Sequence, residues 1–231
     1  MSPWSVFAWL HFLAGGVCHQ IPVHSLQIGD TPLPLCARDT GTYLGLTLAG
    51  GTILLLRRGR AGLLPSWPLL AVFAGLIAGW AADGLNSYLA LMGLPHAYEP
   101  SNTLRLLTGT LEGMALAFVI WPVAAFAFWR APEPRRVIRA QELAVLVAVA
   151  LLVVAVLSQP WAVPRYLAGL LSGLGLVGMF ALLNALLLTV ALRREGTCEK
   201  PTDVLWLLAT GLLPALVELV LLSLLRHQLL G

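Results

Sequence analysis

The feature that most constrains the fold of this chain is a series of long apolar stretches separated by short polar connections. A membrane-spanning α-helix needs about 20 mainly apolar residues, and most of these stretches approach or exceed that length. The pattern predicts an all-α, polytopic transmembrane helical bundle with six to seven spans. The expected spans cover residues 4–17, 40–56, 67–92, 103–129, 141–157, 164–192 and 203–225.

The first of these stretches is the shortest. It crosses a membrane only if it extends to about Gln20, and otherwise it lies partly embedded. A signal peptide requires a basic residue before its apolar core, and this segment has no Lys or Arg there. We therefore expect the segment to be retained in the mature protein.

The composition excludes an ordinary soluble domain. Of 231 residues, 58% are hydrophobic and 11% are charged, whereas soluble domains carry about 25% charged residues. We therefore expect one membrane domain over residues 1–231, with the lipid bilayer as its partner. It divides into a loop at 18–39, motif-bearing helices at 40–129 and C-terminal helices at 140–226. The chain has no extended basic face, which argues against nucleic-acid binding.

The basic residues predict how the chain is oriented in the cell membrane. Arginine-rich clusters at 57–60, 130–139 and 193–200 follow the second, fourth and sixth apolar stretches. Because basic loops stay in the cytoplasm, these three connections are expected inside. The opposite loops, 18–39, 93–102 and 158–165, are then extracytoplasmic, and the first two are expected to meet.

The loop at 18–39 concentrates side chains that can hold a metal ion. Cys18, His19, Cys36 and Asp39 offer two thiolates, an imidazole and a carboxylate, a set suited to zinc or another divalent metal. Adjacent Cys and His can bind one ion only if the backbone bends, and His24 is a substitute ligand. A Cys18–Cys36 disulfide and simple burial of both thiols are the alternatives.

Two neighbouring apolar stretches carry polar side chains at helical spacing. Asp83 and Asn86 share one helix face, as do Arg105, Thr108 and Glu112 on the next stretch. Charged groups within a membrane are costly, so an Asp83–Arg105 ion pair is expected. This pair either locks the bundle or lines a pocket in which Arg105 receives an anionic group. Glu218, with Asn184 on the preceding stretch, is a further polar position inside a span.

Several separated motifs resemble the uncharacterised membrane family DUF2085. They read C-H-Q, S-L-Q-I-G, P-L-C-A-R-D-T-G-T-Y-L-G, D-G-L-N-S and Y-E-P-S-N-T-L-R-L-L-T-G. The resemblance covers about residues 10–125, and Asp39 stands where the family pattern has a cysteine. A metal site is still compatible with this replacement, because a carboxylate can bind zinc. A C-x-x-C redox pair is not, because one of its two cysteines is missing. By resemblance, the motif positions are Cys18, His19, Cys36, Arg38, Thr40, Gly41, Asp83, Asn86, Arg105 and Thr108.

These observations predict an outward-facing polar, metal-binding site that acts on a lipid or small amphiphilic anionic ligand. Cys18, His19, Cys36 and Asp39 would hold the ion, Arg105 would bind the anion, and Asp83 would act as base or as an orienting group. Arg38, Asn86, Thr108 and Glu112 would complete the polar pocket. An ion-coupled carrier using Asp83, Arg105 and Glu218 is one alternative, and a non-catalytic subunit of a membrane complex is another.

Overall fold

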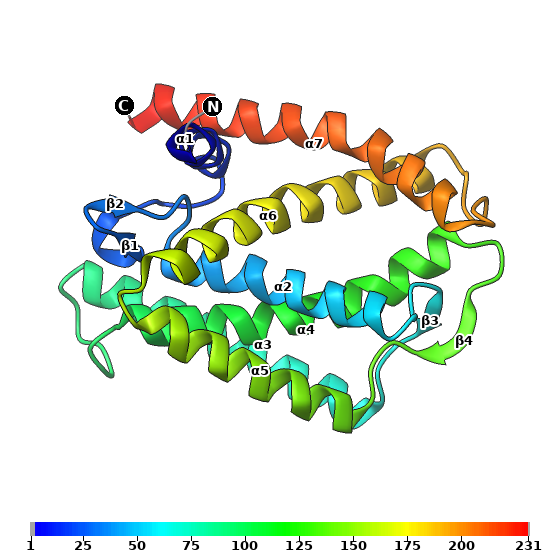
Figure 1. The fold of residues 1–231 in the computed structure, drawn as a ribbon, viewed down its shortest axis with the longest axis horizontal. Helices are drawn as coiled ribbons and strands as arrows, with labels where there is room; N and C mark the ends of the chain where they lie inside the picture. Colours follow the sequence, from blue (N-terminus) through cyan, green and yellow to red (C-terminus); the bar gives the residue numbers. More distant parts are fainter. Residues whose placement is uncertain (1–2, 231) are drawn as a thin grey trace.

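The computed structural model describes residues 3–230, and within them the chain forms seven α-helices (Figure 1). The all-α architecture expected from the apolar stretches is therefore confirmed. The helices are α1 (Pro3–Ala14), α2 (Ala37–Leu55), α3 (Trp67–Leu91), α4 (Asn102–Phe128), α5 (Ala140–Ser158), α6 (Ala162–Ala191) and α7 (Pro201–Leu230).

Five of these helices, α3 to α7, are long and apolar enough to cross a membrane. They coincide within a few residues with five of the expected spans. The expected total of six to seven is thus slightly above the number that length and hydropathy support among residues 3–230.

Helix α1 is too short to cross a membrane on its own. Its 12 residues rise about 18 Å, well below the roughly 30 Å of a bilayer core. In Figure 1 it is seen end-on beside the end of α7, so it lies across the bundle instead of along it. Of the two expectations for this stretch, the full span is not supported.

Helix α2 runs through the centre of the bundle, between α4 and α6 (Figure 1). Its four glycines and four threonines, with Arg38 and Asp39 in the first turn, keep its hydropathy below that of the five candidate spans. The helix begins at Ala37, three residues earlier than expected from the sequence. Arg38 and Asp39 therefore belong to a helix and not to the preceding loop.

The backbones of α2 and α4 are in direct contact. A Cβ atom added at Gly41 would overlap the Leu106 carbonyl oxygen, and one at Gly113 would overlap the Thr42 carbonyl oxygen. Small residues four apart allow membrane helices to approach this closely. Each helix carries one such pair, Gly41 and Gly45 in α2 and Gly109 and Gly113 in α4.

The two ends of the bundle differ in charge. The connections after α2, α4 and α6 lie together at one end, where β3 (Ala61–Leu63) pairs with β4 (Glu133–Arg136) (Figure 1). These connections hold ten of the 14 basic residues. The termini and the small hairpin of β1 (Gln27–Ile28) and β2 (Thr31–Pro32) lie at the opposite end. The ten basic residues are Arg57, Arg58, Arg60, Arg130, Arg135, Arg136, Arg139, Arg193, Arg194 and Lys200.

Candidate metal centre

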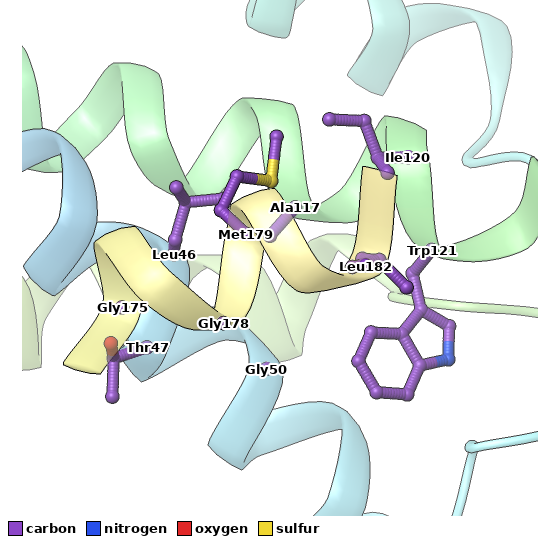
Figure 2. A pocket seen from close by; sticks show the side chains of 10 residues that line it. All are labelled: Leu46, Thr47, Gly50, Ala117, Ile120, Trp121, Gly175, Gly178, Met179 and Leu182. Carbon is purple, nitrogen blue, oxygen red and sulfur yellow. The ribbon is translucent and has the colours of Figure 1, made fainter. Parts of the chain in front are cut away.

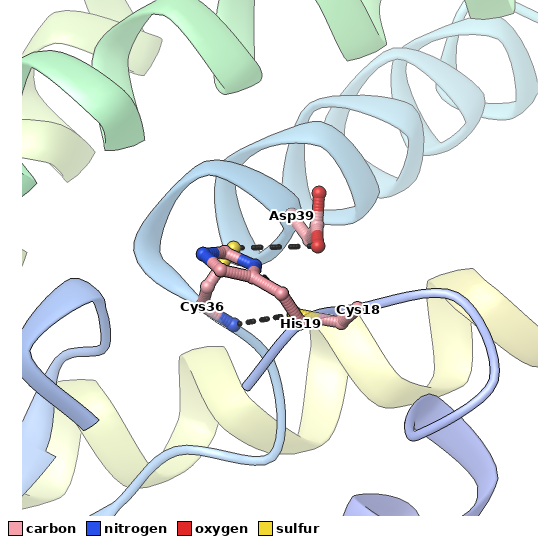
Figure 3. A group of neighbouring side chains, drawn as sticks. All are labelled: Cys18, His19, Cys36 and Asp39. Carbon is pink, nitrogen blue, oxygen red and sulfur yellow. Dashed lines mark hydrogen bonds between the residues drawn. The ribbon is translucent and has the colours of Figure 1, made fainter. Parts of the chain in front are cut away.

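Four side chains with metal-binding donors meet at the less basic end of the bundle (Figure 3). One ligand atom from each of Cys18, His19, Cys36 and Asp39 lies within 4.8 Å of the others. Cys18 Sγ is 3.9 Å from His19 Nδ1, and Cys36 Sγ is 3.3 Å from Asp39 Oδ2. Cys18 and Cys36 are free thiols. The structure thus gathers the four residues that the sequence singled out.

The start of α2 positions two of these donors. Cys36 is the residue just before the helix, and its position three residues before Asp39 places both side chains on the first turn. A thiol at a helix N-terminus is stabilised as thiolate by the unpaired N–H groups and the helix dipole. The Cys36 N–H also donates a hydrogen bond of 3.2 Å to Cys18 Sγ, which ties the two halves of the group together.

The other two donors are adjacent in sequence, and a bend in the backbone brings both to the group. Helix α1 ends at Ala14, and Gln20, the residue after His19, adopts the left-handed conformation with φ 52°. His24 lies outside the group. Its Nδ1 is 3.1 Å from His19 Nε2, so it occupies the place of the outer partner that commonly orients a metal-binding histidine.

The electrostatics of the group separate the two thiols. Hydrogen bonds with Cys18 and His19 lower the pKa of Cys36, although burial opposes them. The hydrogen bond with Cys36 and burial raise the pKa of Cys18, and the hydrogen bond with Cys36 raises the pKa of His19. These shifts favour the thiolate at Cys36, whereas Cys18 and His19 hold their protons more tightly. A divalent ion would replace those protons, because metal ligands must be deprotonated.

The dimensions of the group suit zinc. With zinc–sulfur bonds of about 2.3 Å and zinc–nitrogen or zinc–oxygen bonds of about 2.0–2.2 Å, tetrahedral ligand atoms lie about 3.3–3.8 Å apart. The ligand atoms here lie within 4.8 Å of one another, about 1 Å beyond that range, so the side chains would have to close in around an ion. Two sulfurs, one nitrogen and one oxygen make a donor set that zinc accepts in four-coordinate sites.

Beside this group, Asp83 is held in a dense polar network. Its Oδ2 accepts a hydrogen bond of 2.5 Å from Arg38, and Thr108 lies 3.3 Å from the same oxygen. The Tyr98 hydroxyl donates to Oδ1 at 2.8 Å. Asp83 is 1% exposed, so Arg38 supplies the positive charge that a buried carboxylate needs.

The expected ion pair between Asp83 and Arg105 is therefore wrong. Arg38, in the first turn of α2, forms the ion pair with Asp83. Arg105 instead donates a hydrogen bond to Asn102 Oδ1 at 2.8 Å. Arg105 is 5% exposed and forms no ion pair within residues 3–230. The reason is geometric, because the close contact of α2 with α4 brings Arg38 into reach of α3.

The remaining predicted pocket residues organise the surroundings. The Asn86 side chain accepts from Ala97 N–H at 2.8 Å and donates to the Tyr98 carbonyl at 2.9 Å, so it shapes the loop after α3. Glu112 accepts from Thr42 at 2.9 Å, deeper between α2 and α4. Asn102 donates to the Val23 carbonyl at 3.0 Å, which confirms that the two distant loops meet.

The sequence alone assigns no role to Gln20, Tyr98 or Arg226. The first two lie inside the motif strings, but their partners are remote and no spacing reveals them. Arg226 donates to the carbonyls of Cys18 and His19 from the far end of the chain. The signal in the sequence is an arginine in the last turns of a long helix, a position that favours contact with unpaired carbonyls.

A hollow between α2, α4 and α6 has a different character (Figure 2). It measures about 190 Å³ and is lined mainly by Leu46, Ala117, Trp121, Met179 and Leu182. None of its lining residues is ionisable. The metal-binding donors therefore lie at the end of the bundle and not in this apolar hollow.

Glu218 lies apart from these groups. It is exposed on α7 and accepts a hydrogen bond of 3.0 Å from Asn184 of α6, whereas α3, which carries Asp83, packs mainly against α4. A path shared by Asp83, Arg105 and Glu218 stays a prediction.

Comparison with protein families agrees with the motifs. The family model described as "Predicted membrane protein (DUF2085)" matches residues 18–119. The match begins at Cys18, the first residue of the candidate metal centre, and includes Asp39, Asp83 and Arg105. It confirms the family resemblance over this part of the chain. No curated protein and no solved structure matches the chain.

Proposed function

We propose that this chain, whose residues 18–119 match the family model of the DUF2085 predicted membrane proteins, binds a divalent metal ion at one end of its helical bundle. Zinc is the best match. The observation that carries the proposal is the convergence of Cys18, His19, Cys36 and Asp39, whose ligand atoms lie within 4.8 Å of one another. Two cysteines that merely fill space would not need an imidazole and a carboxylate beside them.

The charge of the surroundings supports a bound cation. Two thiolates and one carboxylate carry three negative charges, so a divalent ion would leave the group with one. The backbone N–H of Cys36 and the N-terminus of α2 also favour anionic sulfur at this place. Bound there, zinc would link the segment after α1 to the start of α2 and would be available as a Lewis acid.

The distribution of basic residues supports an extracytoplasmic position for the metal centre. Ten of the 14 basic residues lie in connections at the opposite end of the bundle. Basic connections stay on the cytoplasmic side. The metal centre, both termini and the loop between α3 and α4 would then face outward.

Metal analysis of the purified protein tests the proposal. The protein, purified without chelators and reduced, is expected to carry about one zinc ion per chain or to take up that amount on titration. The Cys198→Ser variant is the control, because Cys198 is buried at the other end of the bundle and should leave the zinc content unchanged. A reduced protein that takes up no zinc would contradict the proposal and favour inert thiols. Zinc uptake only after reduction would show that a Cys18–Cys36 disulfide competes with the metal.

The lack of an ion pair for Arg105 among residues 3–230 favours a second candidate function, the binding of an anionic amphiphile beside the metal centre. Arg105 is 5% exposed and hydrogen-bonds to Asn102, yet no carboxylate pairs with it among residues 3–230. A buried guanidinium is stable only with compensating charge. The phosphate or carboxylate head of a lipid would supply it, since a guanidinium binds such groups through two parallel hydrogen bonds.

Native mass spectrometry in defined lipid mixtures tests this second function. The unmutated protein is expected to retain phosphatidylglycerol about tenfold more than phosphatidylcholine, and Arg105→Gln is expected to remove that preference. Arg194→Gln, at the opposite end, is the control for general attraction between arginines and anionic lipids. Equal retention by the unmutated protein and Arg105→Gln, with zinc content unchanged, would contradict lipid recognition by Arg105.

A further inference from the structure

We propose that Arg226, near the end of α7, is a positioning residue for the metal centre. Its guanidinium holds the segment of Cys18 and His19 in the bent conformation that directs both side chains toward Cys36 and Asp39. The inference rests on the proposed metal binding. It adds to the centre a residue of the C-terminal helix, which lies outside the matched residues 18–119.

The contacts of Arg226 are concentrated on this one segment. One terminal nitrogen, Nη1, donates to the carbonyl oxygens of Gly15 and Cys18 at 2.8 and 2.9 Å. The other, Nη2, donates to the His19 carbonyl at 2.8 Å. The sequence separation exceeds 200 residues in each case, so only the folded bundle brings the arginine to this segment.

The segment needs such a partner because α1 ends just before it. The last carbonyls of a helix have no partner within the helix and must find one elsewhere. Backbone hydrogen bonds from Val17 and Cys18 to the Ala14 carbonyl close the final turn. Among the carbonyls that follow Ala14, those of Gly15, Cys18 and His19 accept hydrogen bonds from Arg226.

Close packing of α7 keeps the arginine in place. Ser223, one turn before Arg226, donates to the Phe12 carbonyl of α1. A Cβ atom added at Gly16 would overlap the Leu222 side chain, so the glycine permits the approach of α7. The segment is therefore clamped between the end of α1 and the last turns of α7.

Gln20 extends this clamp to the other half of the metal centre. Arg226 Nη1 donates to Gln20 Oε1 at 2.9 Å. The Gln20 amide nitrogen in turn donates to the carbonyls of His11 and Pro34 at 2.7 and 3.0 Å. Pro34 lies two residues before Cys36, so one chain of hydrogen bonds joins Arg226 to both pairs of donors.

The shape of the side chain matters as much as its charge. Arg226 uses two terminal nitrogens on four acceptors, a fork that lysine cannot reproduce with a single ammonium group. If Arg226 contributed only its positive charge, Arg226→Lys would bind zinc as tightly as the unmutated protein. Positioning predicts that Arg226→Lys and Arg226→Gln are both defective.

The zinc affinity of the full-length protein, measured in detergent by competition with a chromophoric chelator, tests the inference. Arg226→Gln is expected to weaken zinc binding about 10–100-fold, as is typical when a group that orients metal ligands is lost. Arg226→Lys should fall within the same range. The matched control is Arg165→Gln, since Arg165 also donates to three backbone carbonyls, those of Gln27, Leu157 and Ser158. Its loss should leave zinc affinity within about twofold, because none of those carbonyls belongs to a residue of the metal centre.

A second measurement separates positioning from metal binding. In the metal-free protein, amide hydrogen exchange over residues 15–20 is expected to be faster in Arg226→Gln than in the unmutated protein or in Arg165→Gln. Unchanged exchange together with unchanged zinc affinity would overturn the role of Arg226 while leaving the metal centre intact. Failure of the unmutated protein to bind zinc would overturn both proposals, and faster exchange would then show that Arg226 only orders the segment.

Discussion

Cys36→Ser is expected to weaken zinc binding by at least about 100-fold. Loss of a group that merely orients a ligand costs about 10–100-fold, and loss of a ligand should exceed it. Cys36 is the central donor, because it directly precedes α2, contacts Asp39 at 3.3 Å and donates a hydrogen bond from its N–H to Cys18. Its lowered pKa makes it the thiolate that a metal would meet first. Competition titration with a chromophoric chelator measures the change.

Two further variants show how large the loss of zinc affinity in Cys36→Ser is relative to other substitutions. Asp39→Asn keeps an oxygen at the same place and should cost less than Cys36→Ser, whereas Cys198→Ser should cost nothing. Zinc should also raise the Tm of the unmutated protein and of Cys198→Ser, because a ligand that binds only the folded state stabilises it. It should not raise the Tm of Cys36→Ser. Equal zinc affinity in Cys36→Ser and the unmutated protein would exclude Cys36 as a ligand.

Gly41→Ala is expected to destabilise the folded protein by about 3 kcal/mol, an overpacking penalty at the upper end of the usual range. The added methyl group would overlap the Leu106 carbonyl oxygen of α4, and neither backbone can move without separating the two helices. Gly51→Ala is the matched control, since it lies in the same helix with open space around it. Alanine is a better helix former than glycine, so this control should be neutral or stabilising by up to about 1 kcal/mol.

Thermal unfolding in detergent, followed by circular dichroism, distinguishes the two glycine variants by the sign of the shift in Tm. Gly113→Ala, which would overlap the Thr42 carbonyl oxygen, should behave like Gly41→Ala. A Gly41→Ala protein as stable as Gly51→Ala would show that α2 and α4 are further apart than described. Because Cys36 and Asp39 lie on the first turn of α2, Gly41→Ala should also weaken zinc binding.

The glycine pairs are a signal in the sequence from which the contact of α2 with α4 could have been predicted. G-x-x-x-G in an apolar stretch is typical of a close helix–helix contact, and the chain contains it at Gly41–Gly45 and at Gly109–Gly113. The same pairs make Arg38 a second candidate partner for Asp83, beside Arg105. Arg38 precedes Gly41 by one helical turn on the contact side, so it competes with Arg105 for the carboxylate of Asp83.

The sequence by itself determined the class of the protein and the residues with metal-binding chemistry. Apolar length and the scarcity of charge require a helical membrane bundle, since a bilayer accepts backbone only as hydrogen-bonded helix or closed barrel. Residues 18–39 are rich in Cys, His and Asp in an otherwise apolar chain, and this contrast identified Cys18, His19, Cys36 and Asp39 as candidate metal ligands. These inferences depend on composition and local spacing.

Only the tertiary structure decided which of these groups are partners. Arg38 and not Arg105 holds Asp83, His24 supports His19 from outside the group, and Arg226 reaches back to Cys18 and His19. Each contact joins residues whose relative placement depends on helix packing or on the course of an irregular segment. Periodicity assigns a residue to a face of its own helix, but the partner of that face is set by close packing of the whole bundle.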